Sequence, residues 1–188
     1  MTPESVRNVV AVLFTTVLAA GAAPASAQSV AEPRTWTVTP FIQTSLGVGR
    51  PAPNDSIGLG AAVAYDWTEN LGFEGEIGHL FDVDDTADVD WSITNFSANV
   101  VYHFNVVRFT PYATFGMGME RSRYSVQPPD TLGFDPSATE VAVNFGGGVK
   151  YLLNERFIAR ADLRRFQAND DAPDYWRLYG GITFFIRR

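Results

Sequence analysis

Most of this 188-residue chain repeats one pattern, in which large apolar residues alternate with small or polar residues. Between residues 57 and 67, Leu59, Val63 and Tyr65 fall on one face, and glycine, alanine and aspartate fall on the other. A period of two is typical of a β-strand with one apolar face, whereas a helix would repeat about every 3.6 residues. The sequence therefore predicts an all-β protein.

Eight segments carry this alternation, and they fill the chain from residue 36 almost to its end. The segments are 36–46, 57–67, 71–81, 91–104, 109–120, 141–151, 156–167 and 175–187. Pro40 in the first segment indicates a bulge or an irregular edge, because proline has no backbone N–H to pair. A tilted strand of about ten residues can cross a bilayer. The segments thus have the length of membrane-crossing strands.

The connectors between these segments alternate in length. The short ones are 68–70, 105–108 and 153–155, and the long polar ones are 47–56, 82–90, 121–138 and 168–174. Arg121 falls in one of the expected long loops. Short turns at one end and long loops at the other are typical of bacterial outer-membrane barrels, and an even strand number allows closure without an exposed edge. We predict an eight-stranded antiparallel up-and-down transmembrane β-barrel.

The first 27 residues have the features of a signal peptide. Arg7 precedes the apolar run 9–20, and Ala25-Ser26-Ala27 has small residues where a signal peptidase requires them. The run is short and is followed by Gly21 and Pro24, which argues against a membrane anchor. We expect a signal peptide at 1–27, a short N-terminal segment at 28–35 and a barrel domain at 36–188.

The amino-acid composition excludes some further classes of structure and function. The chain has no cysteine, so an exported form cannot rely on disulfides. Its formal net charge is −7, and Lys150 is its only lysine. An acidic chain without a basic cluster argues against nucleic acid as a partner.

Several stretches resemble the small outer-membrane β-barrel family that includes the barrel domain of OmpA and, more distantly, OmpX and OmpW. These stretches are PYATFGMG at 111–118, GGGVKY at 146–151, RADLR at 160–164 and YGGITFF at 179–185. The resemblance covers the chain from about residue 36 and implies the outer membrane of a Gram-negative bacterium. It also implies recognition of the last strand by the barrel-assembly machinery. We expect a monomer that contacts outer-membrane lipid and lipopolysaccharide and needs no cofactor.

A soluble eight-stranded barrel, with apolar residues facing inward around a ligand, is the alternative fold. Faces rich in glycine and alanine favour the membrane barrel, because they suit a narrow and crowded interior. Aromatic residues near the strand ends suit the membrane interfaces. They are Trp67, Phe81, Trp91, Phe104, Phe109, Tyr151, Phe157 and Trp176.

Charged residues on the face opposite the apolar one predict a network inside the barrel. Eight strands leave an interior that side chains can fill, and charges buried there must be paired. The predicted network consists of Glu74, Glu76, Lys150, Arg160, Asp162, Arg164 and Arg177. His103 is expected to face inward near the short turns. A filled lumen predicts a structural or interfacial role in the cell envelope.

Two patterns of catalytic type have simpler explanations. The glycines at 146–148 beside Lys150 lack the spacing and the following helix of a phosphate-binding loop. Glu74 and Glu76 share a face, as the carboxylates of glycoside hydrolases can, but pairing with arginines accounts for them.

His79 lies on the predicted lipid face near the outer rim, where some barrels use a histidine beside a serine to modify lipids. No His-x-Ser arrangement accompanies it. We expect no enzymatic activity. A narrow channel for ions or small hydrophobic solutes, and a lipid-modifying enzyme, remain the alternatives.

Five aspartates mark one of the long loops as acidic. They are Asp82, Asp84, Asp85, Asp88 and Asp90. Clustered carboxylates can bind divalent cations weakly, and such cations could bridge the loop to lipopolysaccharide. The segment lacks the glycine turn and closing glutamate of an EF-hand, so a solvated loop is the simpler interpretation.

Overall fold

The computed structural model describes residues 30–47, 56–81, 89–104, 109–126, 137–168 and 174–187. These residues form the strands β1 (Thr35–Gly47), β2 (Ile57–Asp66), β3 (Leu71–Phe81), β4 (Val89–His103), β5 (Phe109–Val126), β6 (Ser137–Leu152), β7 (Phe157–Ala168) and β8 (Tyr175–Arg187). The same residues contain no helix that is long and apolar enough to cross a membrane. The predicted signal peptide at 1–27 lies outside the described residues.

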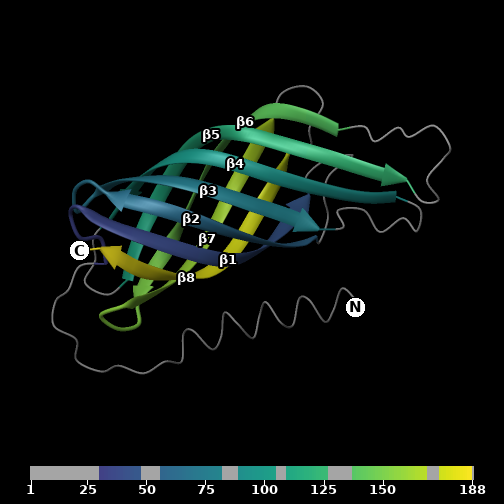
Figure 1. The fold of residues 1–188 in the computed structure, drawn as a ribbon. Coiled ribbons are helices and arrows are strands. Elements are labelled where there is room, and N and C mark those ends of the chain that lie inside the picture. The colour runs from purple at the N-terminus through teal and green to yellow at the C-terminus, as the bar shows by residue number, and fades with distance from the viewer. Residues whose placement is uncertain are drawn as a thin grey trace.

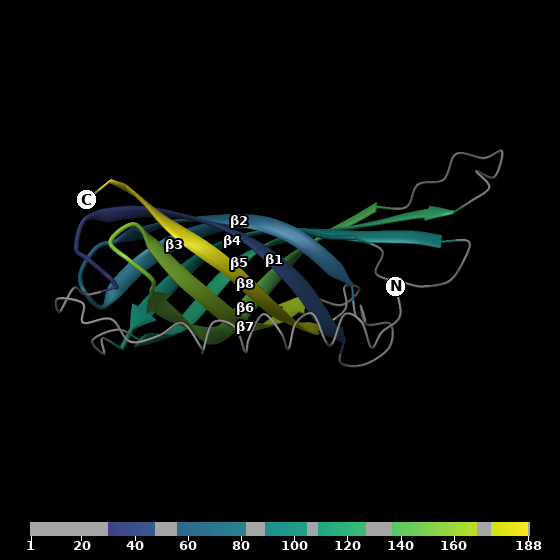
Figure 2. The same cartoon turned by 90° about the horizontal axis from the view of Figure 1, so that it is seen from below.

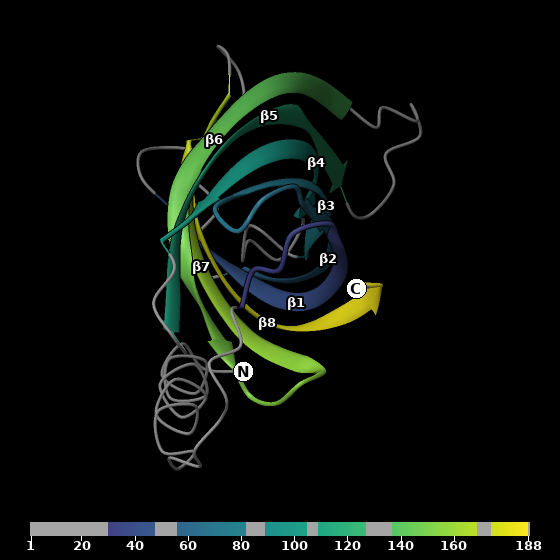
Figure 3. The same cartoon turned by 90° about the vertical axis from the view of Figure 1, so that its left-hand side faces the viewer.

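The strands form one closed antiparallel barrel. Each strand pairs with the next one along the chain, and β8 pairs with β1 to complete the ring (Figure 1). The view along the barrel shows β1 and β8 side by side (Figure 3). The predicted eight-stranded antiparallel barrel is confirmed.

The longest strands in the barrel wall are β4, β5 and β6. These strands have 15, 18 and 16 residues, whereas the other strands have at most 13. β4 and β5 run well past the neighbouring strands at one end of the barrel (Figure 2). Burial still alternates beyond Glu120, with Ser122 buried between exposed Arg121 and Arg123, so Arg121 lies in β5 and faces outward. Its assignment to a loop was wrong, because the polar stretch 121–138 indicated a connector, whereas the pairing of β5 with β6 continues to Arg123.

Two of the short turns are closed by polar side chains. The Thr68 hydroxyl accepts a hydrogen bond from the backbone N–H of Leu71 at 2.9 Å. The Asn154 side-chain oxygen accepts from the N–H groups of Arg156 and Phe157 at 2.9 and 3.1 Å. Such bonds are the usual reason for threonine and asparagine in tight turns. We refer to this end of the barrel as the turn end and to the other as the loop end.

The outer surface is apolar along most of each strand. Phe115 and Met117 are each 61% exposed, and Leu59 is 54% exposed. A soluble barrel would hide such residues inside, so this arrangement favours a surface that faces lipid.

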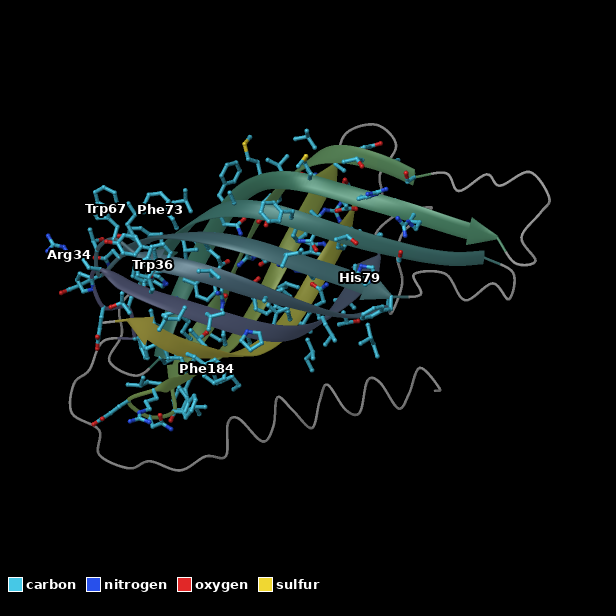
Figure 4. All side chains as sticks on the ribbon, in the orientation of Figure 1. Arg34, Trp36, Trp67, Phe73, His79 and Phe184 are labelled. Atoms are coloured by element: carbon cyan, nitrogen blue, oxygen red, sulfur yellow. The ribbon has the colours of Figure 1, made fainter. Side chains whose placement is uncertain are left out.

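Aromatic side chains form a belt around the turn end. The outward-facing pairs in contact there are Trp36 with Tyr65, Trp67 with Phe73, Tyr102 with Phe104, and Phe157 with Phe184, with ring centroids 4.9, 6.2, 5.1 and 5.2 Å apart. Figure 4 shows Trp36, Trp67 and Phe73 gathered at this end. Such a belt is typical of the interface between lipid and water.

Candidate functional site

The lumen is the candidate functional site, and inward-facing side chains fill it in layers. An apolar layer near the turn end consists of Val30, Leu152 and Ile158, with Phe185 packed against it. A second apolar layer near the loop end consists of Leu80, Ile93, Phe166 and Tyr175. Polar and charged side chains occupy the region between these layers.

Ion pairs cross the middle of the lumen from β3 to β7. Glu74 accepts hydrogen bonds from both Arg160 and Arg164, and the Arg164 Nη2 atom lies 2.8 Å from Glu74 Oε1. In a closed ring of eight strands, β3 and β7 lie four strands apart in either direction, so these bonds connect opposite walls. The three side chains are almost completely buried.

Asp162 lies between the two arginines on β7. Residues two apart on a strand share a face, so Arg160, Asp162 and Arg164 all point inward. The Arg164 Nε atom donates to Asp162 Oδ1 at 2.8 Å, and the Arg160 Nη2 atom donates to Asp162 Oδ2 at 3.3 Å. The carboxylate thus separates two guanidinium groups that would otherwise repel each other.

A second level of ion pairs involves Glu76 and Arg177. The Arg177 Nη1 atom lies 2.5 Å from Glu76 Oε1, and the Arg164 Nη1 atom lies 3.3 Å from Glu76 Oε2. The Arg177 guanidinium also lies 4.7 Å from the ring centre of Phe166, in the apolar layer at the loop end. Arg164 therefore connects both levels of the network.

The network also contains two tyrosines, Tyr112 and Tyr179, which the sequence analysis did not assign to it. The Tyr112 hydroxyl donates to Asp162 and accepts from Arg160 Nε at 2.7 Å. The Tyr179 ring lies under the guanidinium groups of Arg160 and Arg177, at 5.3 and 5.2 Å. The alternation pattern places both tyrosines on the inward face, and this signal could have identified them.

Lys150 reaches the network through Tyr112 and not through a carboxylate, because its Nζ atom lies 5.8 Å from the Tyr112 ring centre. Its Nζ atom lies 2.9 Å from His103 Nε2, and the other ring nitrogen of His103 lies 3.9 Å from an Asp66 oxygen. Among the described residues, no carboxylate oxygen lies within 4.0 Å of Lys150. The structure thus brings the other six predicted members together, with Lys150 placed beside His103 near the turn end.

The glycines of β6 make room for the network. A Cβ atom added to Gly148 would lie 2.5 Å from the Tyr112 hydroxyl oxygen and 2.2 Å from the Ala161 carbonyl oxygen. The stretch 146–148 continues as a strand into Lys150, with no helix following it. This geometry differs from that of a phosphate-binding loop.

The remaining predicted sites lie outside the lumen or outside the described residues. His79 faces outward near the end of β3 (Figure 4), and its Nδ1 atom lies 2.8 Å from the Thr94 hydroxyl. Asp82, Asp84, Asp85 and Asp88 are outside the described residues, as is the side chain of Asp90 in β4. The described part of the chain has no group of three or more acidic or histidine side chains placed to hold a metal ion.

An apolar outer face, a charged inner face and a closed ring of strands define a transmembrane β-barrel. Residues 15–182 match the family model of the outer membrane protein beta-barrel domain. The chain belongs to this family, as its sequence resemblance indicated. Its strands are therefore transmembrane strands of an outer-membrane protein.

Solved structures of bacterial barrels share the fold. The N-terminal barrel domain of OprF from Pseudomonas aeruginosa is 19% identical with a TM-score of 0.60, and the match covers 85% of this chain and 100% of that one. Neisserial surface protein A is 15% identical with a TM-score of 0.64, covering 79% and 96%. Ail of Yersinia pestis is 16% identical with a TM-score of 0.53, covering 80% and 97%. No curated protein matched the chain.

Proposed function

We propose that this protein is a structural barrel of the outer membrane, with a lumen that is sealed by side chains and loops that contact the envelope surface. The observation that carries the proposal is the set of ion pairs from Glu74 on β3 to Arg160 and Arg164 on β7. These bonds occupy the central cross-section, and apolar layers lie on both sides of them.

The energetics of the network support a closed lumen. A hydrated ion could pass only after these buried pairs had separated, and removing one partner of a buried pair costs about 3–5 kcal/mol. Arg160, Arg164 and Arg177 also pack against tyrosine and phenylalanine rings, which restricts their movement. We therefore expect the favoured state to block the passage of hydrated ions.

The orientation of the barrel follows from the usual architecture of such proteins, with short turns in the periplasm and longer loops outside. The signal peptide at 1–27 would export the chain, and the barrel-assembly machinery would insert it. The acidic loop at 82–90 would then face the cell exterior beside lipopolysaccharide. In this role the protein acts as a monomer, without a cofactor and without catalysis.

Conductance across a planar lipid bilayer tests this proposal. The full mature chain, added under conditions that insert a water-filled porin, should give an almost silent current. Insertion is checked on the same preparation by its altered mobility in SDS before boiling. Stable, large and ion-selective current steps would contradict a sealed lumen and favour the narrow-channel alternative.

A further inference from the structure

The extended wall of β4, β5 and β6 carries an outward basic face directly beyond the apolar surface. On these three strands, Phe96, Met119 and Val141 lie in one row of paired residues and are 55–56% exposed. In the next outward row toward the loop end, Thr94 pairs with Arg121 and Arg121 pairs with Thr139. The apolar surface thus ends on all three strands at the same row.

The next outward row toward the loop end also has an arginine between two hydroxyl-bearing residues. Ser92 pairs with Arg123, and Arg123 pairs with Ser137. Outward residues two apart on a strand lie about 6.8 Å from each other, and neighbouring strands lie about 4.8 Å apart. The backbones of Arg121 and Arg123 are therefore adjacent on one outward face, with four hydroxyl-bearing residues paired beside them on β4 and β6. We call the set Ser92, Thr94, Arg121, Arg123, Ser137 and Thr139 the basic rim.

The arginines of the basic rim are exposed and have no acidic partner among the side chains that the structure describes. Neither Arg121 nor Arg123 lies within 4.0 Å of a carboxylate oxygen in that set, which does not include the side chain of Asp90 on β4. Arg165, which also faces outward near the loop end, differs from them. It binds Asp174 at 2.7 Å, and its guanidinium lies 5.9 Å from the Trp176 ring centre. Charge complementarity on the β5 side must therefore come from a group that the described residues do not supply.

The depth of Arg121 and Arg123 in the membrane indicates which anionic group could pair with them. An arginine that points sideways just past the apolar surface of a membrane barrel lies at the depth of the lipid headgroups. Guanidinium groups bind phosphate oxygens through paired hydrogen bonds, and serine and threonine hydroxyls can donate further bonds. Beside the rim, His79 lies 2.8 Å from the Thr94 hydroxyl and contacts Phe81, at the border between the apolar and polar surfaces.

We propose that the basic rim binds the phosphate groups of lipopolysaccharide in the outer leaflet, with Arg121 and Arg123 as the main ligands. This inference rests on the proposed function, because it requires the loop end to face the cell exterior. It assigns a lipid-binding role to the wall of β4 to β6, separate from the sealed lumen.

The test uses the full mature chain in phosphatidylcholine nanodiscs titrated with lipid A. The double variant Arg121→Gln/Arg123→Gln is compared with the wild type and with Arg156→Gln/Arg165→Gln, which removes the same charge elsewhere. Each arginine near an anionic membrane surface strengthens binding about fivefold. The affinity of the rim variant for diphosphorylated lipid A should fall about 30-fold, equivalent to about 2 kcal/mol. The control variant should bind like the wild type.

Three binding results and one stability result would overturn the proposal. One is an unchanged affinity of the rim variant, and another is an equal affinity of the wild type for lipid A with and without phosphate. The third is equal binding of phosphatidylglycerol, which would show a general anionic surface. If the rim variant unfolded more readily in phosphatidylcholine alone, the arginines would be bound by acidic residues of the chain itself, and the proposal would fail. Unboiled mobility in SDS confirms that each variant is folded, and conductance tests the sealed lumen separately from lipid binding.

Discussion

At the scale of single residues, Arg160 has partners from three strands. Its guanidinium binds Glu74 on β3, the Tyr112 hydroxyl on β5 and Asp162 on its own strand β7. Replacing such a side chain leaves the partner carboxylates buried without their cation, and this costs more than the bonds themselves.

We therefore expect Arg160→Ala to lower the free energy of unfolding by about 3–5 kcal/mol. Urea unfolding in lipid vesicles measures this change. Arg156→Ala is the matched control, because Arg156 is exposed in the turn after β6 and should change stability by less than about 0.5 kcal/mol. In the double variant with Glu74→Ala, the two losses should add to less than their sum, since both substitutions break the same pair. Equal effects of Arg160→Ala and Arg156→Ala would contradict the network.

Gly148 permits a prediction about how tightly the lumen is packed beside β6. A methyl group there would overlap the Tyr112 hydroxyl and the Ala161 carbonyl, so Gly148→Ala should destabilise the barrel by about 1–3 kcal/mol. Gly75 is the matched control, because an added Cβ atom has nothing within 4 Å of it. The temperature at which the folded form is lost in SDS gives the comparison. Similar losses for Gly148→Ala and Gly75→Ala would show that crowding at Tyr112 is unimportant.

At the scale of elements, the segment before β1 closes the turn end. The N–H of Arg34 donates to the Asp66 carbonyl at 2.6 Å, and Arg34 has a φ of 62°. This left-handed conformation is uncommon for a residue other than glycine, and it costs about 1–2 kcal/mol. Burial of Ala31, and of Val30 against Leu152, helps to offset that cost.

A charge in this segment should detach it from the barrel. Val30→Asp would place a carboxylate against the apolar side chains of Leu152 and Ile158. We expect faster hydrogen exchange at the Arg34 amide and a lower urea midpoint. Val30→Ile, which keeps an apolar side chain, should change both much less. If exchange at Arg34 were the same in all three proteins, the apolar layer at the turn end would not hold the segment.

At the scale of the whole molecule, closure gives every strand two neighbours, so none of the eight is an edge strand of the ring, and only one side of β4, β5 and β6 extends past a neighbour at the loop end. In lipid, an unpaired backbone group costs several kcal/mol, so a closed barrel resists opening by detergent. We expect the unboiled protein to migrate at a different position in SDS gels from the boiled one. Identical migration would contradict a membrane barrel.

The sequence alone determined the strands, their faces and the closed all-β architecture. Alternation along a strand is a local property, since successive side chains point to opposite faces of the sheet, and the polarity of each one indicates whether it faces lipid or the interior. This is why the inward positions of Glu74 and Arg160 could be read from the chain. The predicted bounds 71–81 agree with β3 for the same reason.

Tertiary structure decided which inward residues meet and where the wall ends. Lys150 and Arg160 both point inward, and they are register partners on β6 and β7. Yet Lys150 contacts His103, and Arg160 contacts Glu74 across the lumen. Similarly, only the pairing of β5 with β4 and β6 places Arg121 in a strand rather than a loop. The physical reason is that contacts across the lumen and between strands depend on strand tilt and register. These arise from the closed sheet and not from any one segment.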